Sequence, residues 1–200
     1  MLKIGITGGI GTGKSMVSRI FALLNIPVYD SDLRAKQVMA HNPQLKHELI
    51  AAFGPETFNE QGLNRTRLAA IVFPEPEKLT KLNSLVHPHV KQDFINWSEE
   101  NKNAPYVLKE AALMFETEAY KQVDEMITVF APLDIRMERL LKRDTHRTET
   151  DLKNIIAKQL PEEEKLRRAD HVVYNDDSQL VIPQVLKLHE YFLAKAAEKR

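Results

Sequence analysis

The feature that most constrains this chain is a glycine-rich stretch near the N-terminus, Gly8-Gly9-Ile10-Gly11-Thr12-Gly13-Lys14-Ser15. It follows the apolar run 2–7 and precedes an amphipathic run that contains Val17, Ile20, Phe21 and Leu24. A strand, then G-x-x-x-x-G-K-[ST], then a helix is the pattern of a phosphate-binding loop. The alternative is a glycine-rich turn that holds no phosphate, and the Lys-Ser pair in register disfavours it. The stretch therefore predicts a nucleotide-phosphate site.

Glycine tolerates positive φ, so successive backbone N–H groups of such a loop can turn inward around an anion. The residues expected to surround the phosphates are Gly9, Ile10, Gly11, Thr12, Gly13, Lys14, Ser15 and Met16. The helix that begins near Lys14 adds its positive dipole end and brings the N–H groups of Ser15 and Met16 to the α and β phosphates. We expect Lys14 at the β and γ phosphates and the Ser15 hydroxyl on Mg²⁺.

The composition is that of an ordinary soluble protein, with 43% hydrophobic and 28% charged residues among 200. Lys and Arg number 28, as do Asp and Glu, which weighs against nucleic-acid and membrane-surface proteins. The absence of cysteine excludes disulfides and Cys-ligated zinc. No apolar run approaches the ~18 residues of a membrane span, and the opening strand leaves no room for a signal peptide. We therefore expect a cytoplasmic protein.

A second strand is predicted over the short β-prone run from Asn25 to Tyr29, which leads into Asp30-Ser31-Asp32. Ligands of a parallel sheet bind beyond the carboxyl ends of its strands, so this D-x-D motif is expected near the phosphate loop. One carboxylate there can accept the proton of an attacking hydroxyl. Asp and Ser are also good helix N-caps, so we expect one aspartate to cap a helix and the other to be functional.

Residues 33–103 are expected to be mainly helical and to contain no strand, with Pro88 breaking or kinking the last helix at His87. About seventy residues between two strands far exceed a usual crossover. This length indicates a helical subdomain over the crevice that grips an acceptor, and plain scaffold is the alternative. A metal site at His87-Pro88-His89 is disfavoured because no matching ligands stand nearby at metal-binding spacing.

Three more strands are predicted, over 106–114, 126–130 and 171–174, followed by a helix from Leu180 to about Ala197 that packs on the sheet. Glu110 is placed near the end of the first of these strands. An acid at that position would hold Mg²⁺ through water, and a merely solvated carboxylate is the alternative.

Arginines cluster in the segment 134–147. Three share one helical face by their spacing, and a fourth is close by: Arg136, Arg139 and Arg143, with Arg147. Like charges stacked this way destabilise a helix by roughly a few tenths of a kcal/mol per pair unless they bind an anion, and Arg matches phosphate oxygens. We interpret the segment as a mobile lid. A solvated helix with interspersed acids is the alternative.

Taken in order, these motifs resemble the dephospho-CoA kinase family almost from end to end. The family's TGGIGSGKS-like loop is matched by residues 7–15, and its D-A-D motif by Asp30-Ser31-Asp32. Further matches are Gly62-Leu63-Asn64-Arg65, Val72-Phe73, Leu82 to Pro88, Arg139, Arg143-Asp144, Arg147, Gln159 and Arg168 to Asn175. The family's P-L-L-F-E appears without its proline as residues 112–116, and Glu110 replaces a frequent Asp.

The resemblance implies a single P-loop NTPase-type α/β domain over 1–200, with a parallel five-stranded sheet flanked by helices. Within it we expect a nucleotide-binding core (1–32, 104–134 and 168–200), a helical acceptor-binding insert (33–103) and an Arg-bearing lid (135–167). The implied reaction transfers the γ-phosphoryl of ATP, with Mg²⁺, to the ribose 3′-hydroxyl of dephospho-CoA and gives coenzyme A and ADP.

Carried over position by position, the resemblance makes Asp32 the candidate base and Asp30 its structural partner. The other implied roles are as follows: Lys14 and Arg143 in catalysis, Arg65 and His87 with Asp32 on the acceptor, Arg143 and Arg147 in the lid, and Arg139, Arg147 and Asn175 on ATP, with Asn175 beside the adenine. The expected partners are ATP and dephospho-CoA, with no nucleic acid and no membrane. The chain is expected to be a monomer or a weak homo-oligomer.

Three other functions fit the sequence less well. Another small P-loop kinase would act on a nucleoside, a nucleotide or a small alcohol, whereas the long insert favours a bulky acceptor. A GTPase-like switch requires D-x-x-G and N-K-x-D motifs, and neither occurs. An ATP-binding module without turnover would leave Asp32 and the clustered arginines unexplained.

Overall fold

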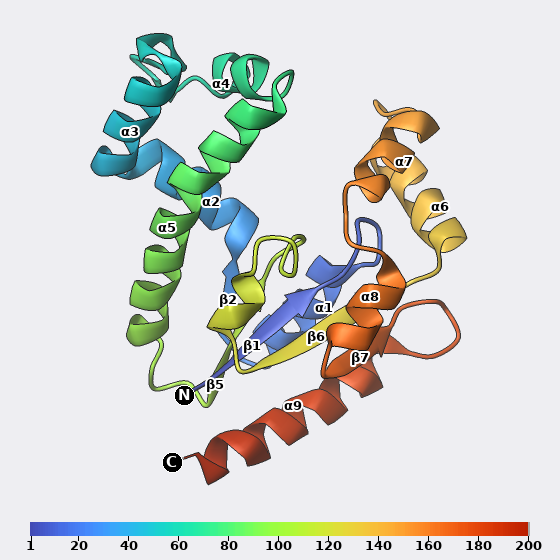
Figure 1. Ribbon diagram of the computed structural model, residues 1–200. Coiled ribbons are helices and arrows are strands. Elements are labelled where there is room, and N and C mark those ends of the chain that lie inside the picture. The colour runs from blue at the N-terminus through green and yellow to red at the C-terminus, as the bar shows by residue number, and fades with distance from the viewer. Residues whose placement is uncertain (200) are drawn as a thin grey trace. The chain divides into compact units, whose positions relative to one another are not determined.

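The computed structural model describes residues 1–199 and divides into two compact units. The core unit comprises Met1–Asp30 and the chain from Asn101 onward, and the helical unit comprises Ser31–Glu100. Figure 1 shows the elements of both. Each unit has its own cluster of buried apolar residues.

The core unit is built on one five-stranded sheet in the order β2-β5-β1-β6-β7. Its strands are β1 (Leu2–Thr7), β2 (Val28–Asp30), β5 (Tyr106–Glu110), β6 (Glu125–Phe130) and β7 (His171–Tyr174). Every neighbouring pair is parallel, and the register places Glu110 beside both Asp30 and Ile6. The carboxyl ends of the strands therefore share one edge. The predicted α/β fold with a parallel five-stranded sheet is confirmed.

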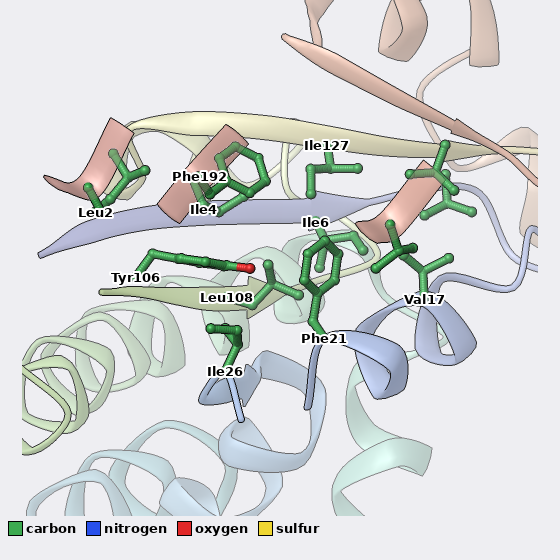
Figure 2. Packing of buried hydrophobic residues seen from close by; sticks show 14 residues of the cluster. Leu2, Ile4, Ile6, Val17, Phe21, Ile26, Tyr106, Leu108, Ile127 and Phe192 are labelled. Carbon is green, nitrogen blue, oxygen red and sulfur yellow. The ribbon is translucent and has the colours of Figure 1, made fainter. Parts of the chain in front are cut away.

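Two helices cover one face of this sheet. The helices of the core unit are α1 (Lys14–Leu23), α6 (Leu133–Arg143), α7 (Glu149–Ala157), α8 (Glu162–Arg168) and α9 (Val181–Glu198), with a short 3-10 turn, η2 (Ala119–Gln122). Alternate β1 residues Leu2, Ile4 and Ile6 join Phe21 of α1 and Phe192 of α9 in one buried cluster (Figure 2). Strand alternation puts every second side chain on the same face, so this cluster is what holds α1 and the phosphate loop against the sheet.

The other face carries a smaller apolar cluster around Met114, Phe115 and Met126. Met126 alternates with Ile127, which belongs to the first cluster, so the two clusters lie on opposite faces. Partly buried Leu160, two residues before α8, and Ala169, directly after it, pack against this second cluster. The chain around α8 is thereby attached to the sheet.

Two predicted strand boundaries are wrong. Strand β5 ends at Glu110 rather than Met114, because β1, its partner, ends at Thr7 and offers no further edge to pair with. Strand β2 covers Val28–Asp30 rather than residues 25–29. Asn25 has φ 61°, a left-handed conformation that Asn tolerates, and it belongs to the turn after α1.

The helical unit contains four α-helices in its described residues, and α5 packs on the other three. Its elements are α2 (Ser31–His41), α3 (Pro43–Phe53), η1 (Pro55–Thr57), β3 (Phe58–Asn59), β4 (Gly62–Leu63), α4 (Arg65–Val72) and α5 (Pro76–Glu100). Its core includes Leu45, Leu49 and Leu68. The expectation of no strand here is wrong, because β3 and β4 form an antiparallel pair. Strands of two residues are too short to leave an alternation pattern in the sequence.

Of the predicted break or kink at His87, the break is wrong, because α5 runs without interruption through Pro88. Proline removes one N–H from the helix and frees the carbonyl four residues earlier, here that of Ser84. Ser84 and Pro88 are both exposed, so water can satisfy that carbonyl. Val86 and Phe94 are buried on either side of the proline and hold both halves in place.

None of the helices described in residues 1–199 is both long and apolar enough to cross a membrane.

Candidate active site

The phosphate loop lies between β1 and α1, at the carboxyl edge of the sheet (Figure 1). Gly13 has φ 88°, in the left-handed region that favours glycine. Its carbonyl accepts the N–H groups of Met16 (3.0 Å) and Val17 (3.2 Å), which begins α1. A side chain at this position would also collide with the Asn175 carboxamide. Glycine is thus required at position 13 because the backbone is left-handed there and because Asn175 leaves no space for a side chain.

In the middle of the loop, the predicted phosphate-contacting residues Thr12 and Ile10 also form hydrogen bonds within the protein. The fully buried Thr12 donates both Oγ1 (2.9 Å) and its N–H (3.2 Å) to the Gly9 carbonyl, so its side chain holds the turn. The Ile10 N–H donates to Gln159 Oε1 at 3.0 Å, and the Ile10 carbonyl accepts Arg136 Nε at 2.8 Å. Tertiary contacts therefore fix the middle of the loop.

Lys14 and Ser15 meet Glu110 at the end of β5. Lys14 Nζ lies 2.7 Å and Ser15 Oγ 2.8 Å from the same oxygen, Glu110 Oε1. Burial acts to raise the pKa of Glu110, but the Lys14 charge and the hydrogen bonds outweigh it, so the pKa lies below its ordinary value. The carboxylate is therefore ionised at neutral pH. Glu110 is not merely solvated, because the fold brings it to both polar side chains at the end of the motif.

Behind the loop lies a buried charged cluster of Arg136, Glu162 and Lys165. Lys165 is fully buried and lies 2.9 Å from Glu162 Oε1, which is 3.3 Å from Arg136 Nη1. Buried charges need partners, and Glu162 Oε1 is the partner of both cations, whereas within residues 1–199 Arg136 Nη2 and Glu162 Oε2 have no hydrogen-bond partner. A side chain on Gly9 would collide with both Arg136 and Glu162. The cluster therefore packs directly against the loop backbone.

Sequence reasoning placed Arg136 among the lid arginines and missed this role. Arg136 is 2% exposed and in phase with the buried Leu140, four positions later on α6. The signal available in the sequence was a basic residue spaced four positions from Leu140, which places it on the apolar face of the helix.

Asn175, which follows β7, ties the phosphate loop to α6. Its side chain is buried and donates from Nδ2 to the Thr12 carbonyl at 2.7 Å. Its own carbonyl accepts Arg139 Nη1 at 2.9 Å, and Arg139 Nη2 lies 3.2 Å from Asp177. Both predicted ATP-binding residues thus stand beside the loop, where each also has a structural partner.

The two remaining lid candidates share one counterion. Arg143 donates to Asp144 through Nε (2.8 Å) and Nη2 (2.9 Å), and Arg147 Nη1 lies 3.4 Å from the same carboxylate. The hydrogen bond to Asp144 raises the pKa of Arg143. Arg143 is exposed at the end of α6. These arginines therefore pair with an acid at the start of the α6–α7 connection rather than with the loop.

The acceptor-site candidates lie in the helical unit. Asp32 is exposed in the first turn of α2, and Arg65 is the exposed first residue of α4. His87 is exposed on α5, where neighbouring atoms partly desolvate the ring and lower its pKa. Its neighbour His89 is 3.1 Å from Glu48 instead. Among residues 1–199, no group of three or more His, Asp or Glu side chains is placed to hold a metal ion.

Comparison with known proteins decides the family. The family model described as dephospho-CoA kinase matches residues 2–180. A dephospho-CoA kinase of Bacteroides fragilis is 38% identical over 194 residues, which cover 97% of this chain and 94% of that protein. The chain belongs to the dephospho-CoA kinase family. A dephospho-CoA kinase of Porphyromonas gingivalis is 39% identical over 190 residues, covering 95% and 94% of the two chains.

Solved structures agree with this family fold. The crystal structure of TT1252 from Thermus thermophilus has a TM-score of 0.81 at 34% identity and covers 96% of this chain and 97% of its own. A dephospho-CoA kinase from Campylobacter jejuni has a TM-score of 0.72 at 22% identity, which supports the fold alone. As a member of the dephospho-CoA kinase family, the chain is an ATP-dependent phosphotransferase that acts on dephospho-CoA. The alternative of a small kinase for another acceptor is thereby set aside.

Proposed function

We propose that the core unit binds ATP, that the helical unit binds dephospho-CoA, and that the γ-phosphoryl passes to the ribose 3′-hydroxyl. The observation that carries this proposal is the cluster of Lys14, Ser15 and Glu110 beside the phosphate loop. It joins a cation, a hydroxyl and an ionised acid at the carboxyl edge of a parallel sheet, where ligands of such sheets bind.

Ser15 and Glu110 supply the donor set that Mg²⁺ prefers. Their oxygens lie 2.8 Å apart, and Mg²⁺ is commonly held by one or two protein oxygens together with waters and substrate phosphates. When bound, the ion would neutralise charge on the β and γ phosphates. We therefore assign Mg²⁺ to Ser15, with Glu110 reached directly or through water.

Lys14 and the loop backbone are proposed to carry the phosphate charge. A loose, metaphosphate-like transition state asks for in-line positioning and charge stabilisation rather than covalent chemistry. Lys14 Nζ is held by Glu110 at 2.7 Å, close to the loop that the triphosphate would occupy. On nucleotide binding, Lys14 exchanges part of this contact for phosphate oxygens, and the N–H groups of the loop complete the cradle.

The segment 135–167 is proposed to act as a lid that brings Arg143 and Arg147 to the phosphates. Both arginines now share the single carboxylate of Asp144, which offsets only part of their positive charge, and both remain accessible. Arginine forks match phosphate oxygens, and a closing lid excludes water from the reaction. Arg139 is proposed to support the nucleotide site through its hydrogen bond to Asn175, beside which the adenine would lie.

Asp32 is proposed as the base for the acceptor hydroxyl. It is ordered in the first turn of α2, and the chain reaches it directly from β2. A carboxylate orients the hydroxyl and takes its proton late in the transfer. Arg65 and His87 are exposed polar groups of the same unit and are proposed to contact the acceptor. We propose that the protein works in the cytoplasm as a monomer or weak homo-oligomer.

The direct test is an ADP-release assay with purified protein and Mg·ATP across dephospho-CoA, adenosine, nucleoside monophosphates and pantothenate. We expect turnover with dephospho-CoA alone, and ³¹P NMR of the product should show a 3′-phosphate monoester. Comparable turnover with a nucleoside, or phosphate at another position, would overturn the proposed acceptor site.

A further inference from the structure

Gln159 stands at a fixed point between α7 and α8. Its N–H donates to the Ile156 carbonyl (3.0 Å) and continues the last turn of α7. The next residue, Leu160, donates its N–H to Glu116 Oε1 at 2.7 Å and packs against the second apolar cluster. The backbone that carries Gln159 is therefore held from both sides.

The helix that follows Gln159 is anchored to the phosphate loop. Lys165 and Glu162 of α8 pair with each other, and Glu162 pairs with Arg136. Arg136 in turn donates Nε to the Ile10 carbonyl at 2.8 Å. The phosphate loop and the helix that follows Gln159 are thus linked through this buried charged cluster.

The Gln159 carboxamide reaches the loop itself. Its Oε1 accepts the Ile10 N–H at 3.0 Å, although the two residues are 149 positions apart in the chain. A glutamine amide has one acceptor oxygen and two N–H donors. Within residues 1–199, no hydrogen bond is seen from Nε2, and the side chain is only partly buried. Because the carboxamide is planar, the bond between Oε1 and the loop backbone also keeps the two N–H donors of Nε2 next to the loop.

We propose that Gln159 contacts the terminal phosphoryl group of the bound nucleotide, with Nε2 donating to a γ-phosphate oxygen while Oε1 keeps the Ile10 N–H. This inference rests on the proposed function, because it adds a residue to the same phosphate site. A neutral donor at this position favours a triphosphate over a diphosphate. It also links the end of α7 to the transferring group.

The test compares binding of ADP with binding of a non-hydrolysable ATP analogue, each with Mg²⁺, by isothermal titration calorimetry. Gln159→Met preserves the length of the side chain but removes its hydrogen bonds, and Gln159→Glu keeps an acceptor for Ile10 while replacing the donor with a negative charge. A hydrogen bond to a charged group is worth enough that each variant should bind the analogue about tenfold more weakly or worse. The affinity for ADP should change less than about threefold, and Gln159→Glu should show the larger loss.

Gln179→Glu is the matched control, because Gln179 is exposed in the loop before α9, and this variant should bind both nucleotides like wild type. Equal losses for ADP and the analogue in both Gln159 variants would mean that Gln159 only pins the loop, which overturns the proposal. Tighter binding of the analogue by the variants would mean that the Gln159 side chain blocks the phosphate site, and this result would also overturn the proposal. No acceptor is present in these titrations, so their result is independent of whether dephospho-CoA is the substrate.

Discussion

Lys14 and Glu110 form a 2.7 Å ion pair in which 13% and 10% of the two side chains are exposed. The pair joins the end of the phosphate loop to the end of β5, and Ser15 shares the same carboxylate oxygen. Removing one partner of a buried ion pair is strongly destabilising because the other charge is left buried and unpaired. Glu110 therefore holds the lysine and the serine hydroxyl in position before the nucleotide arrives.

Glu110→Gln should lower kcat by about a hundredfold and raise the Mg²⁺ concentration needed for half-maximal activity, because the site loses an anionic oxygen. The measurement is a Mg²⁺ titration of ADP release at saturating substrates. Glu118→Gln removes an equivalent charge from an exposed pair with Lys121 and should behave like wild type. An unchanged Mg²⁺ dependence in Glu110→Gln would remove Glu110 from the metal site.

Asp32→Asn should retain ATP binding and lose about 10²- to 10⁴-fold in kcat, because the amide cannot accept the hydroxyl proton. Titration calorimetry gives the nucleotide affinity and steady-state assays give kcat. Asp30→Asn is the comparison within the same motif, and we expect it to keep most of its turnover. A wild-type kcat in Asp32→Asn would exclude Asp32 as the base.

Arg143→Ala should slow phosphoryl transfer by about 10²- to 10³-fold while leaving KM for dephospho-CoA nearly unchanged, as for removal of one charge-stabilising donor. Single-turnover kinetics isolate the transfer step. Lys142→Ala removes the neighbouring charge, which pairs with Glu138 on the exposed side of α6, and should have little effect. A rise in KM for dephospho-CoA with an unchanged transfer rate would place Arg143 on the acceptor instead.

His87→Ala should raise KM for dephospho-CoA by about tenfold, the value of one hydrogen bond to a charged group, and should leave ATP affinity intact. Substrate-dependence curves for both substrates separate these effects. His89→Ala, which loses the contact with Glu48, should instead lower the melting temperature. A loss confined to ATP affinity would contradict the role proposed for His87.

Lys109 supplies a pH-dependent contribution to stability. Burial, with the Lys3 charge, lowers its pKa from 10.5 to about 8, although Nζ donates to Gln122 at 2.7 Å. Between these two pKa values the unfolded chain binds more protons than the folded one, so the free energy of unfolding rises with pH in that window. Below pH 8 the folded state carries the cost of the buried charge.

Lys109→Met should abolish this contribution. The free energy of unfolding of wild type relative to the variant should therefore increase by about 2 kcal/mol between pH 7 and 9.5. Urea unfolding of both proteins at several pH values measures the difference. Parallel pH profiles of the two proteins would show that Lys109 does not titrate in this range.

Much of the fold follows from local sequence patterns. Strands β1, β6 and β7 appear as short apolar runs, and the order of strands and helices along the chain indicates a parallel sheet. Features that depend on neighbours were not predictable from these patterns. Strand β5 ends where its partner β1 ends, and α5 passes through Pro88 because packing on both sides of the proline holds it.

The sequence by itself determined the phosphate loop, because positive φ at glycine, the Lys-Ser pair and the following helix act within a few residues of one another. Only the tertiary structure decided what surrounds that loop. Arg136 and Gln159 reach Ile10 across 126 and 149 positions of the chain. Such contacts depend on how the sheet and α8 pack, and no local spacing encodes them. A buried arginine and a partly buried glutamine are therefore recognised as parts of the site only once the chain is folded.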